Sequence, residues 1–261
     1  MKYILPLTHP LLQTVDVSVK LSGLQILDSV SIGVPDGAVT GLIGPNGAGK
    51  TTVFNVMSGF VKPDSGVVRF QGRRLGHIHP YGLTRMGISR TRQGVGLFPS
   101  LSALDNVMMG AAAKAKTGII AQALAMPWVD RERNRIREQA LAVMTELGID
   151  SDAKRFPGEL PYPVQKRVAL ARALVSDPKV LLLDEPAGGI SAADMADLGR
   201  LIRSWVPERT VLLVEHHMAL VMEVCDLIWV LDAGKVIASG TPEQVRNDPA
   251  VLAAYLGEEE A

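Results

Sequence analysis

Residues Gly44–Thr52 hold the residue types in this chain that are best suited to chemistry, because they combine glycines with a lysine and a threonine at fixed spacing. The run fits the pattern G-x-x-x-x-G-K-[ST], in which Lys50 and Thr51 are the last two positions. Glycines let the backbone wrap closely, so that successive N–H groups point inward and bind an anion. Lys50 can then neutralise the charge of terminal phosphates, and the Thr51 hydroxyl can ligate Mg²⁺. The sequence therefore predicts a polyphosphate-binding loop made of Gly44, Pro45, Asn46, Gly47, Ala48, Gly49, Lys50, Thr51 and Thr52.

The segments on either side supply the elements that such a loop needs. Val39–Ile43 is apolar except for one threonine and one glycine, which predicts a buried strand. The residues from Lys50 to about Met57 predict a helix that stops near Gly59. The N-terminus of that helix would add a positive field to the loop. Because strand, lysine and helix are in register, we favour a phosphate-binding loop over a chance glycine-rich turn.

A second apolar run, Val180–Leu183, ends in two carboxylates, Asp184 and Glu185. A continuous apolar run is typical of a strand that is buried on both faces. Ligands of open α/β sheets bind at the carboxyl ends of the strands. We therefore expect Asp184 to hold Mg²⁺ opposite Thr51, and Glu185 to orient or deprotonate an attacking water molecule. A strand end with solvated acids is the alternative.

Two further polar residues are candidates for the same site. His216 follows the apolar run Val211–Val214, where its imidazole could give a hydrogen bond to a γ-phosphate. Gln93 is a candidate ligand of the metal or of a water molecule. Each has an ordinary alternative, because a histidine after a strand is more often structural and Gln93 could be a polar loop residue.

Composition and charge set limits on the class of protein. The 261 residues contain 27 Lys plus Arg and 27 Asp plus Glu, so the balanced charge gives no general attraction to nucleic acid or anionic lipid. The one cysteine, Cys225, excludes an internal disulfide and lies among apolar residues, which predicts a packed thiol. No run of apolar residues is long enough to cross a bilayer, and the first residues do not resemble a signal peptide. We expect a cytoplasmic protein.

The hydrophobic pattern predicts an α/β fold. Alternating apolar positions in residues 13–35 indicate antiparallel strands before the phosphate-binding loop. Strands at Val180–Leu183, Thr210–Val214 and Leu227–Leu231 alternate with helices, which is typical of a parallel sheet flanked by helices. We expect one domain over residues 1–261: a P-loop core with a mostly parallel sheet and an N-terminal antiparallel β subdomain (about 12–99 and 176–261), and an inserted α-helical subdomain (about 100–175).

The order of these motifs resembles that of the ATP-binding-cassette (ABC) ATPases over nearly the whole chain. Within that family the chain is most similar to the cassettes of branched-chain amino-acid importers and their urea or amide relatives. The tracts that carry the resemblance are Gly41–Thr52, Gly87–Gln93, Ala171–Leu174, Asp184–Gly189, Val214–His216 with Met218, Gly240–Pro249 and Ala254–Gly257.

The resemblance implies how such a chain works. Two cassettes face each other head to tail, and each ATP with its Mg²⁺ lies between one P-loop and the other chain's signature. Closure on ATP drives transmembrane permease subunits, with which the helical insertion and Gln93 make contact. The chain would then lie peripherally on the cytoplasmic face of the inner membrane, with a periplasmic or extracellular solute-binding protein as an indirect partner and no nucleic acid.

The signature departs from the family pattern. Residues Leu160, Pro161, Tyr162, Pro163 and Val164 stand where the family has Leu-Ser-Gly-Gly-Gln and the importer branch has Leu-Pro-Tyr-Gly-Gln. The motif works through backbone N–H groups at a helix N-terminus. Pro163 fits a first helical turn but supplies no N–H, and it lacks the freedom of glycine. We therefore expect a weakened signature and a heterodimer with unequal sites.

Three other positions also differ from the family. Leu21 stands where an aromatic residue usually stacks on adenine, which predicts weak selection of the base. Arg92 replaces the usual Phe, and His217 replaces the usual Asp, with no consequence that the sequence defines.

The functions to be weighed are an import ATPase, a low-turnover regulatory half of a cassette pair, and a lipopolysaccharide-export cassette. Cassettes of translation or DNA repair fit less well, because they carry two cassettes or a long coiled-coil insertion.

Overall fold

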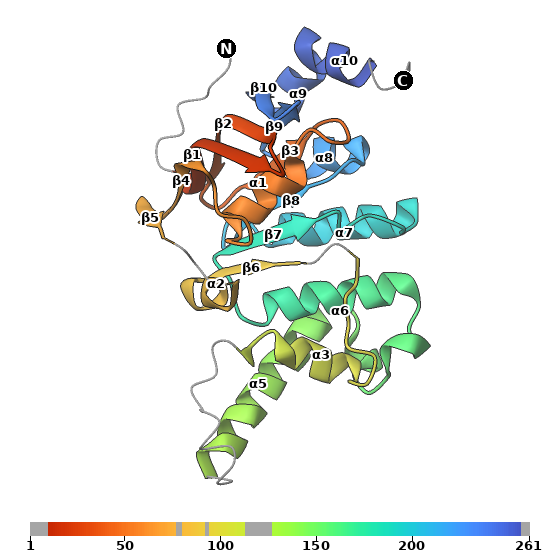
Figure 1. Ribbon diagram of the computed structural model, residues 1–261. Helices are drawn as coiled ribbons and strands as arrows, with labels where there is room; N and C mark the ends of the chain where they lie inside the picture. The colour runs from red at the N-terminus through yellow and green to blue at the C-terminus, as the bar shows by residue number, and fades with distance from the viewer. Residues whose placement is uncertain (1–9, 77–79, 92–93, 113–126, 257–261) are drawn as a thin grey trace.

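Two β-sheets of different character organise the molecule (Figure 1). The computed structural model describes residues 10–76, 80–91, 94–112 and 127–256. The first sheet has the strand order β2-β1-β4-β5, and its neighbouring strands are antiparallel. Its strands are β1 (Pro10–Leu21), β2 (Leu24–Pro35), β4 (Ser65–Phe70) and β5 (Arg73–Leu75). The antiparallel strands predicted before the P-loop are therefore confirmed.

The second sheet has the order β10-β9-β3-β8-β7-β6 and is parallel from β9 to β6, whereas β10 pairs antiparallel with β9. Its strands are β3 (Val39–Ile43), β6 (Ile88–Arg90), β7 (Val180–Asp184), β8 (Thr210–Val214), β9 (Leu227–Asp232) and β10 (Lys235–Gly240). The predicted α/β fold with a mostly parallel sheet is confirmed.

The central strands are apolar throughout because both faces of the parallel sheet are covered. Every residue of β3, β7 and β8 is buried. Leu181 and Leu183 pack into a core with the helices on one face. Leu182 points to the opposite face, where it joins a core that includes Phe54 and Leu12. The sheet is thus held between a helical layer and a layer that contains the antiparallel sheet.

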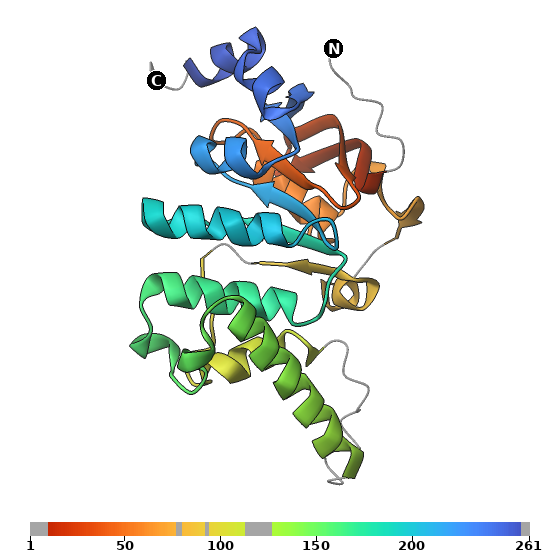
Figure 2. The ribbon, with the colours of Figure 1, turned by 180° about the vertical axis from the view of Figure 1, so that it is seen from behind.

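Helices α3, α5 and α6 come between β6 and β7 in the chain, and they lie beside the β6 edge of the sheet (Figures 1 and 2). Their bounds are α3 (Ala103–Met109), α5 (Pro127–Glu146) and α6 (Tyr162–Leu174). The Ser102 hydroxyl accepts a hydrogen bond from the Asp105 N–H at 3.1 Å, so a side-chain cap marks the start of α3.

The remaining helices are α1 (Lys50–Met57), α2 (Pro80–Met86), α7 (Ala192–Ser204), α8 (Met218–Val224), α9 (Pro242–Arg246) and α10 (Pro249–Leu256). The Ser191 hydroxyl caps α7 by accepting the Asp194 N–H. Cys225 is buried, and burial, helped by the nearby Asp226 charge, raises the pKa of its thiol to about 12. Among the described helices, none has the length and hydropathy that a bilayer crossing requires.

Candidate functional site

The predicted motifs follow three adjacent strands. In the parallel ladder β3-β8-β7, Leu42 pairs with Val214, and Val214 pairs with Asp184. The P-loop, the Glu215–His216 segment and Glu185 therefore leave the sheet at the same edge, which we call the P-loop edge. The Glu185 N–H donates to the Val214 carbonyl at 2.9 Å, which extends the ladder one residue beyond β7.

The P-loop has a backbone that only glycine allows at two positions. Gly44 has φ of 148°, and a Cβ atom there would lie 1.9 Å from the Leu231 carbonyl oxygen. Gly49 has φ of 101° and is the N-cap of α1, where a Cβ atom would lie 2.7 Å from Leu27 Cδ2. The glycines thus let the loop pass against the neighbouring strand and turn into the helix.

The Lys50 ammonium group lies within the loop. Its Nζ donates to the carbonyl oxygens of Gly44 at 2.6 Å and of Pro45 at 2.7 Å. The loop is supported from outside by Gly234, whose N–H donates to the Ala48 carbonyl at 3.1 Å. Thr51 is exposed in the first turn of α1. The arrangement places one positive charge and one exposed hydroxyl beside the N-terminus of a helix.

Asp184 is a buried carboxylate, with 5% of its surface exposed. Burial raises its pKa; the charge of Arg90 acts in the opposite direction, and the charges of Glu185 and Glu215 raise it further. The Thr91 hydroxyl accepts the Asp184 N–H at 3.1 Å. A bound cation would offset this crowding of negative charge. The carboxylate of Asp184 and the hydroxyl of Thr51 are oxygen donors of the kind that Mg²⁺ prefers, so the residues fit that ion.

Glu185 combines an unusual backbone with an accessible carboxylate. Its φ of 47° lies in the left-handed region, which non-glycine residues seldom adopt. Its side chain is about one-third exposed, and Oε1 lies 4.0 Å from Nδ1 of His216. The structure therefore brings the two proposed catalytic side chains of β7 and β8 close together.

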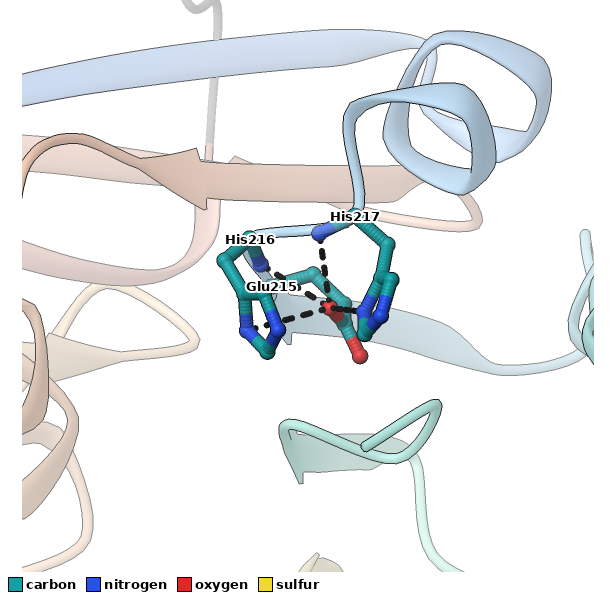
Figure 3. Close-up of side chains that lie close together, drawn as sticks. All are labelled: Glu215, His216 and His217. Carbon is teal, nitrogen blue, oxygen red and sulfur yellow. Dashed lines mark hydrogen bonds and ion pairs between the residues drawn. The ribbon is translucent and has the colours of Figure 1, made fainter. Parts of the chain in front are cut away.

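Glu215 lies at the centre of this part of the site (Figure 3), although the sequence analysis gave it no role. It is 1% exposed, and its carboxylate accepts the backbone N–H groups of His216 at 2.9 Å and His217 at 3.0 Å. Oε2 also lies 2.8 Å from Nδ1 of His217 and 3.7 Å from Nδ1 of His216. Burial would raise its pKa, but hydrogen bonds from His217, Ala187 and His216 outweigh burial and lower it.

The ligand atoms of Glu215, His216 and His217 lie within 4.8 Å of one another, a spacing that a metal ion could bridge. Oε2 of Glu215, however, already accepts two backbone N–H groups and the His217 ring. The cluster is therefore explained by hydrogen bonding. A charged residue directly after a fully buried strand was the one sequence signal that could have drawn attention to Glu215.

The signature residues stand at the start of α6. Pro161 is the N-cap and Pro163 lies in the first turn, where the missing N–H does not interrupt the helix. The Gln165 N–H donates to the Pro161 carbonyl at 3.0 Å, and its side-chain amide donates to the Leu160 carbonyl at 2.9 Å. Farther along α6, Lys166 is 8% exposed, and its Nζ donates to the Glu185 carbonyl at 3.1 Å.

Three further positions were singled out by the sequence. Arg92 and Gln93 are outside the described residues. Leu21 ends β1 and pairs with Leu24 across the hairpin; both are exposed, Leu21 at 46% and Leu24 at 69%. Leu21 therefore offers an aliphatic surface to solvent at the position where we expect an adenine base.

The chain matches two family profiles, "ABC transporter" over residues 27–188 and "Branched-chain amino acid ATP-binding cassette transporter" over residues 235–261. It is 37% identical to the high-affinity branched-chain amino acid transport ATP-binding protein LivG of Salmonella typhimurium, over 97% of this chain and 100% of LivG. It is 34% identical to the lipopolysaccharide export system ATP-binding protein LptB of Acidithiobacillus ferridurans, over 90% of this chain and 91% of LptB.

The solved structures agree with the sequence comparisons. An ATP-binding cassette of an ABC transporter, solved in its ADP conformation, superposes with a TM-score of 0.82 at 30% identity and covers 96% of this chain and 100% of its own. Together with the profile match over more than half of the chain, this shows that the protein belongs to the ABC transporter ATP-binding cassettes, a family of ATP-hydrolysing subunits.

Proposed function

We propose that this chain is the ATP-hydrolysing subunit of an ABC importer for branched-chain amino acids or a related small polar solute. The observation that carries the proposal is the arrangement of P-loop, Asp184–Glu185 and His216 at the ends of adjacent strands. The importer branch is supported by the profile match of the tail and by the similarity to LivG.

Each residue at the P-loop edge has a proposed role. Backbone N–H groups of Gly44–Thr52 and the Lys50 ammonium group bind the phosphates of ATP. Thr51 and Asp184 would hold Mg²⁺, together with Gln93, and the ion would neutralise phosphate charge. Glu185 accepts a proton from the attacking water molecule, and His216 gives a hydrogen bond to the γ-phosphate.

A hollow beside the helical segment supports coupling to permease subunits. A cavity of about 340 Å³ lies between α2–β6 and the helices α3 and α6. Its lining includes the exposed apolar side chains of Phe60, Phe98 and Met109, and the cations Arg90 and Arg172. An amphipathic permease helix with an acidic end fits this lining. Contact there would place the chain peripherally at the cytoplasmic face of the membrane, with a solute-binding protein on the other side.

Two alternatives are less well supported. A lipopolysaccharide-export cassette is favoured by the similarity to LptB, but that similarity covers less of both chains than the similarity to LivG. A low-turnover regulatory half of a heterodimer is favoured by Pro163. It is opposed by Glu185 and His216, which provide this chain's own P-loop with the side chains that hydrolysis needs.

Steady-state hydrolysis of MgATP by the purified chain, measured beside Glu185→Gln, tests the proposal. We expect wild-type turnover, and we expect Glu185→Gln to bind ATP while losing turnover by about 100-fold or more. ATP binding without turnover would show that the chain needs the signature of a different cassette. Undiminished turnover in Glu185→Gln would overturn the assignment of Glu185.

Adding the permease pair and a solute-binding protein in proteoliposomes tests the importer branch. We expect leucine, isoleucine or valine bound to that protein to increase hydrolysis. Stimulation by lipopolysaccharide with its own permease, and none by the amino acids, would favour export instead.

A further inference from the structure

Glu215 is a buried acid that accepts hydrogen bonds from two loops of the site. An ionised carboxylate with 1% exposure is costly unless donors surround it. Here the donors are three backbone N–H groups and one imidazole. Because these hydrogen bonds outweigh burial, the pKa of Glu215 lies below its usual value, and the carboxylate is ionised at neutral pH.

The two oxygens of Glu215 face different loops. Oε1 accepts the N–H of Ala187 at 2.9 Å, two residues beyond Glu185 in the turn after β7. Oε2 accepts the N–H groups of His216 and His217 in the loop after β8 (Figure 3). The Glu215 carboxylate therefore bridges the turn that contains Glu185 and the loop that contains His216.

The turn after β7 needs such support. A left-handed backbone at a residue other than glycine costs on the order of 1–3 kcal/mol, and it persists only where its surroundings hold it. Three hydrogen bonds hold the backbone of Glu185. Its N–H donates to the Val214 carbonyl, and its own carbonyl accepts the Gly188 N–H and the Lys166 ammonium group. The bond from Ala187 to Glu215 adds a hydrogen bond to a side chain of the His216 loop.

We infer that Glu215 is a positioning residue for ATP hydrolysis, which fixes the turn of Glu185 and the backbone of His216 relative to each other. The inference rests on the proposed roles of Glu185 and His216. Glu215 itself lies behind them and need not touch nucleotide or water. Misplacement of a reacting group by about 1 Å can cost about 100-fold in rate, so loss of the bridge should lower kcat while leaving the P-loop unchanged.

Glu215→Gln is the decisive variant, because it keeps the size of the side chain but replaces one acceptor by an NH₂ donor. That donor would face either Ala187 or the two histidine N–H groups, and so one half of the bridge is lost. We expect kcat to fall about 10- to 100-fold, with KM and the dissociation constant for MgATP changed less than about twofold. Glu215→Asp keeps the charge but is one methylene too short, and it should fall in the same range.

His217→Ala is the matched control. It removes the one imidazole donor of Glu215 and leaves both sides of the backbone bridge in place. We expect kcat to stay within about threefold of wild type. A fall equal to that of Glu215→Gln would show that the imidazole contact, and not the bridge, matters, and it would overturn the inference.

The measurements use the full-length chain, with its permease and partner cassette if the chain alone does not turn over. A wild-type kcat in Glu215→Gln would overturn the inference, and so would equal losses in kcat and in nucleotide affinity. Failure of both Glu215 variants to fold would also overturn it, because the role would then be structural. If Glu185→Gln retains turnover, the proposed function fails instead, which separates the two outcomes.

Discussion

The P-loop edge and the signature at the start of α6 differ in what holds them in place. The P-loop edge is fixed by contacts between segments that are distant in the sequence, such as Gly44 against Leu231 and Glu215 with Ala187. The hydrogen bonds that hold the signature lie within one helical turn, from Gln165 back to Leu160 and Pro161.

This difference explains why the signature can depart from the family pattern without loss of the fold. A substitution at the P-loop edge disturbs the core, whereas the first turn of a helix accepts proline without loss of the fold. The changes at Pro163 and Val164 therefore leave the fold of this chain intact. We propose that they weaken what the signature offers to a partner's nucleotide, and the heterodimer with unequal sites stays a prediction.

Gly44→Ala should have the largest effect on the P-loop edge. Its Cβ atom would lie 1.9 Å from the Leu231 carbonyl oxygen, so strand or loop must move. We expect loss of detectable MgATP binding and a decrease in unfolding free energy on the order of 3 kcal/mol, measured by nucleotide titration and denaturant melts.

Gly47→Ala is the control for that variant. Gly47 has φ of 77°, but a Cβ atom there meets open space. The cost should be limited to backbone strain of about 1–2 kcal/mol. Equal losses in the two variants would show that close packing against Leu231 is not what makes the loop sensitive.

The sequence predicted the local parts of this picture well. Val39–Ile43 and Val180–Leu183 were recognisable because buried parallel strands are continuously apolar, and the loops that follow them carry a fixed motif. Strands β5, β6 and β10 were missed; the first two have three residues each, too few to show a period, and they are strands only because longer neighbours pair with them.

Other features could not be predicted because they depend on tertiary contacts. The strand order β3-β8-β7 brings together segments that are more than a hundred residues apart. The role of Glu215 depends on the Ala187 N–H, and the buried environment of Lys166 depends on how α6 packs against the turn after β7. Neither contact leaves a periodic pattern in the sequence.

Lys166→Met should have the next largest effect, because Lys166 is the contact that joins the two regions. Its ammonium group links α6 to the Glu185 carbonyl at 3.1 Å and lies 5.6 Å from the centre of the Tyr162 ring. Methionine keeps the length and loses the donor. We expect kcat to fall about 10-fold at unchanged nucleotide affinity, and Lys166→Arg to recover much of it. Wild-type turnover in Lys166→Met would show that the two regions are independent.

Restoring the signature with Pro163→Gly and Val164→Gln tests the comparison in the opposite direction. The changes return an N–H and glycine freedom to the first turn of α6. We expect turnover of the purified chain to rise about threefold or more, because a hydrogen bond to a charged group contributes about 1.5–3 kcal/mol and only the part that is stronger in the transition state raises the rate. The nucleotide affinity of the monomer should not change. An unchanged rate would show that Pro163 does not weaken the signature.

Leu21→Tyr should have the smallest effect, because it acts on the base and not on the phosphates. The wild-type chain should bind ATP and GTP with comparable affinity, as Leu21 presents no aromatic face. An aromatic ring there can add about 0.5–1.5 kcal/mol of stacking, which is about a two- to tenfold gain in ATP affinity.

Leu24→Tyr is the control, because it places the same ring on the opposite strand of the hairpin, on a residue that is even more exposed. Equal gains in both variants would show that the ring binds the base non-specifically, and a strong ATP preference in the wild type would show that another residue recognises adenine.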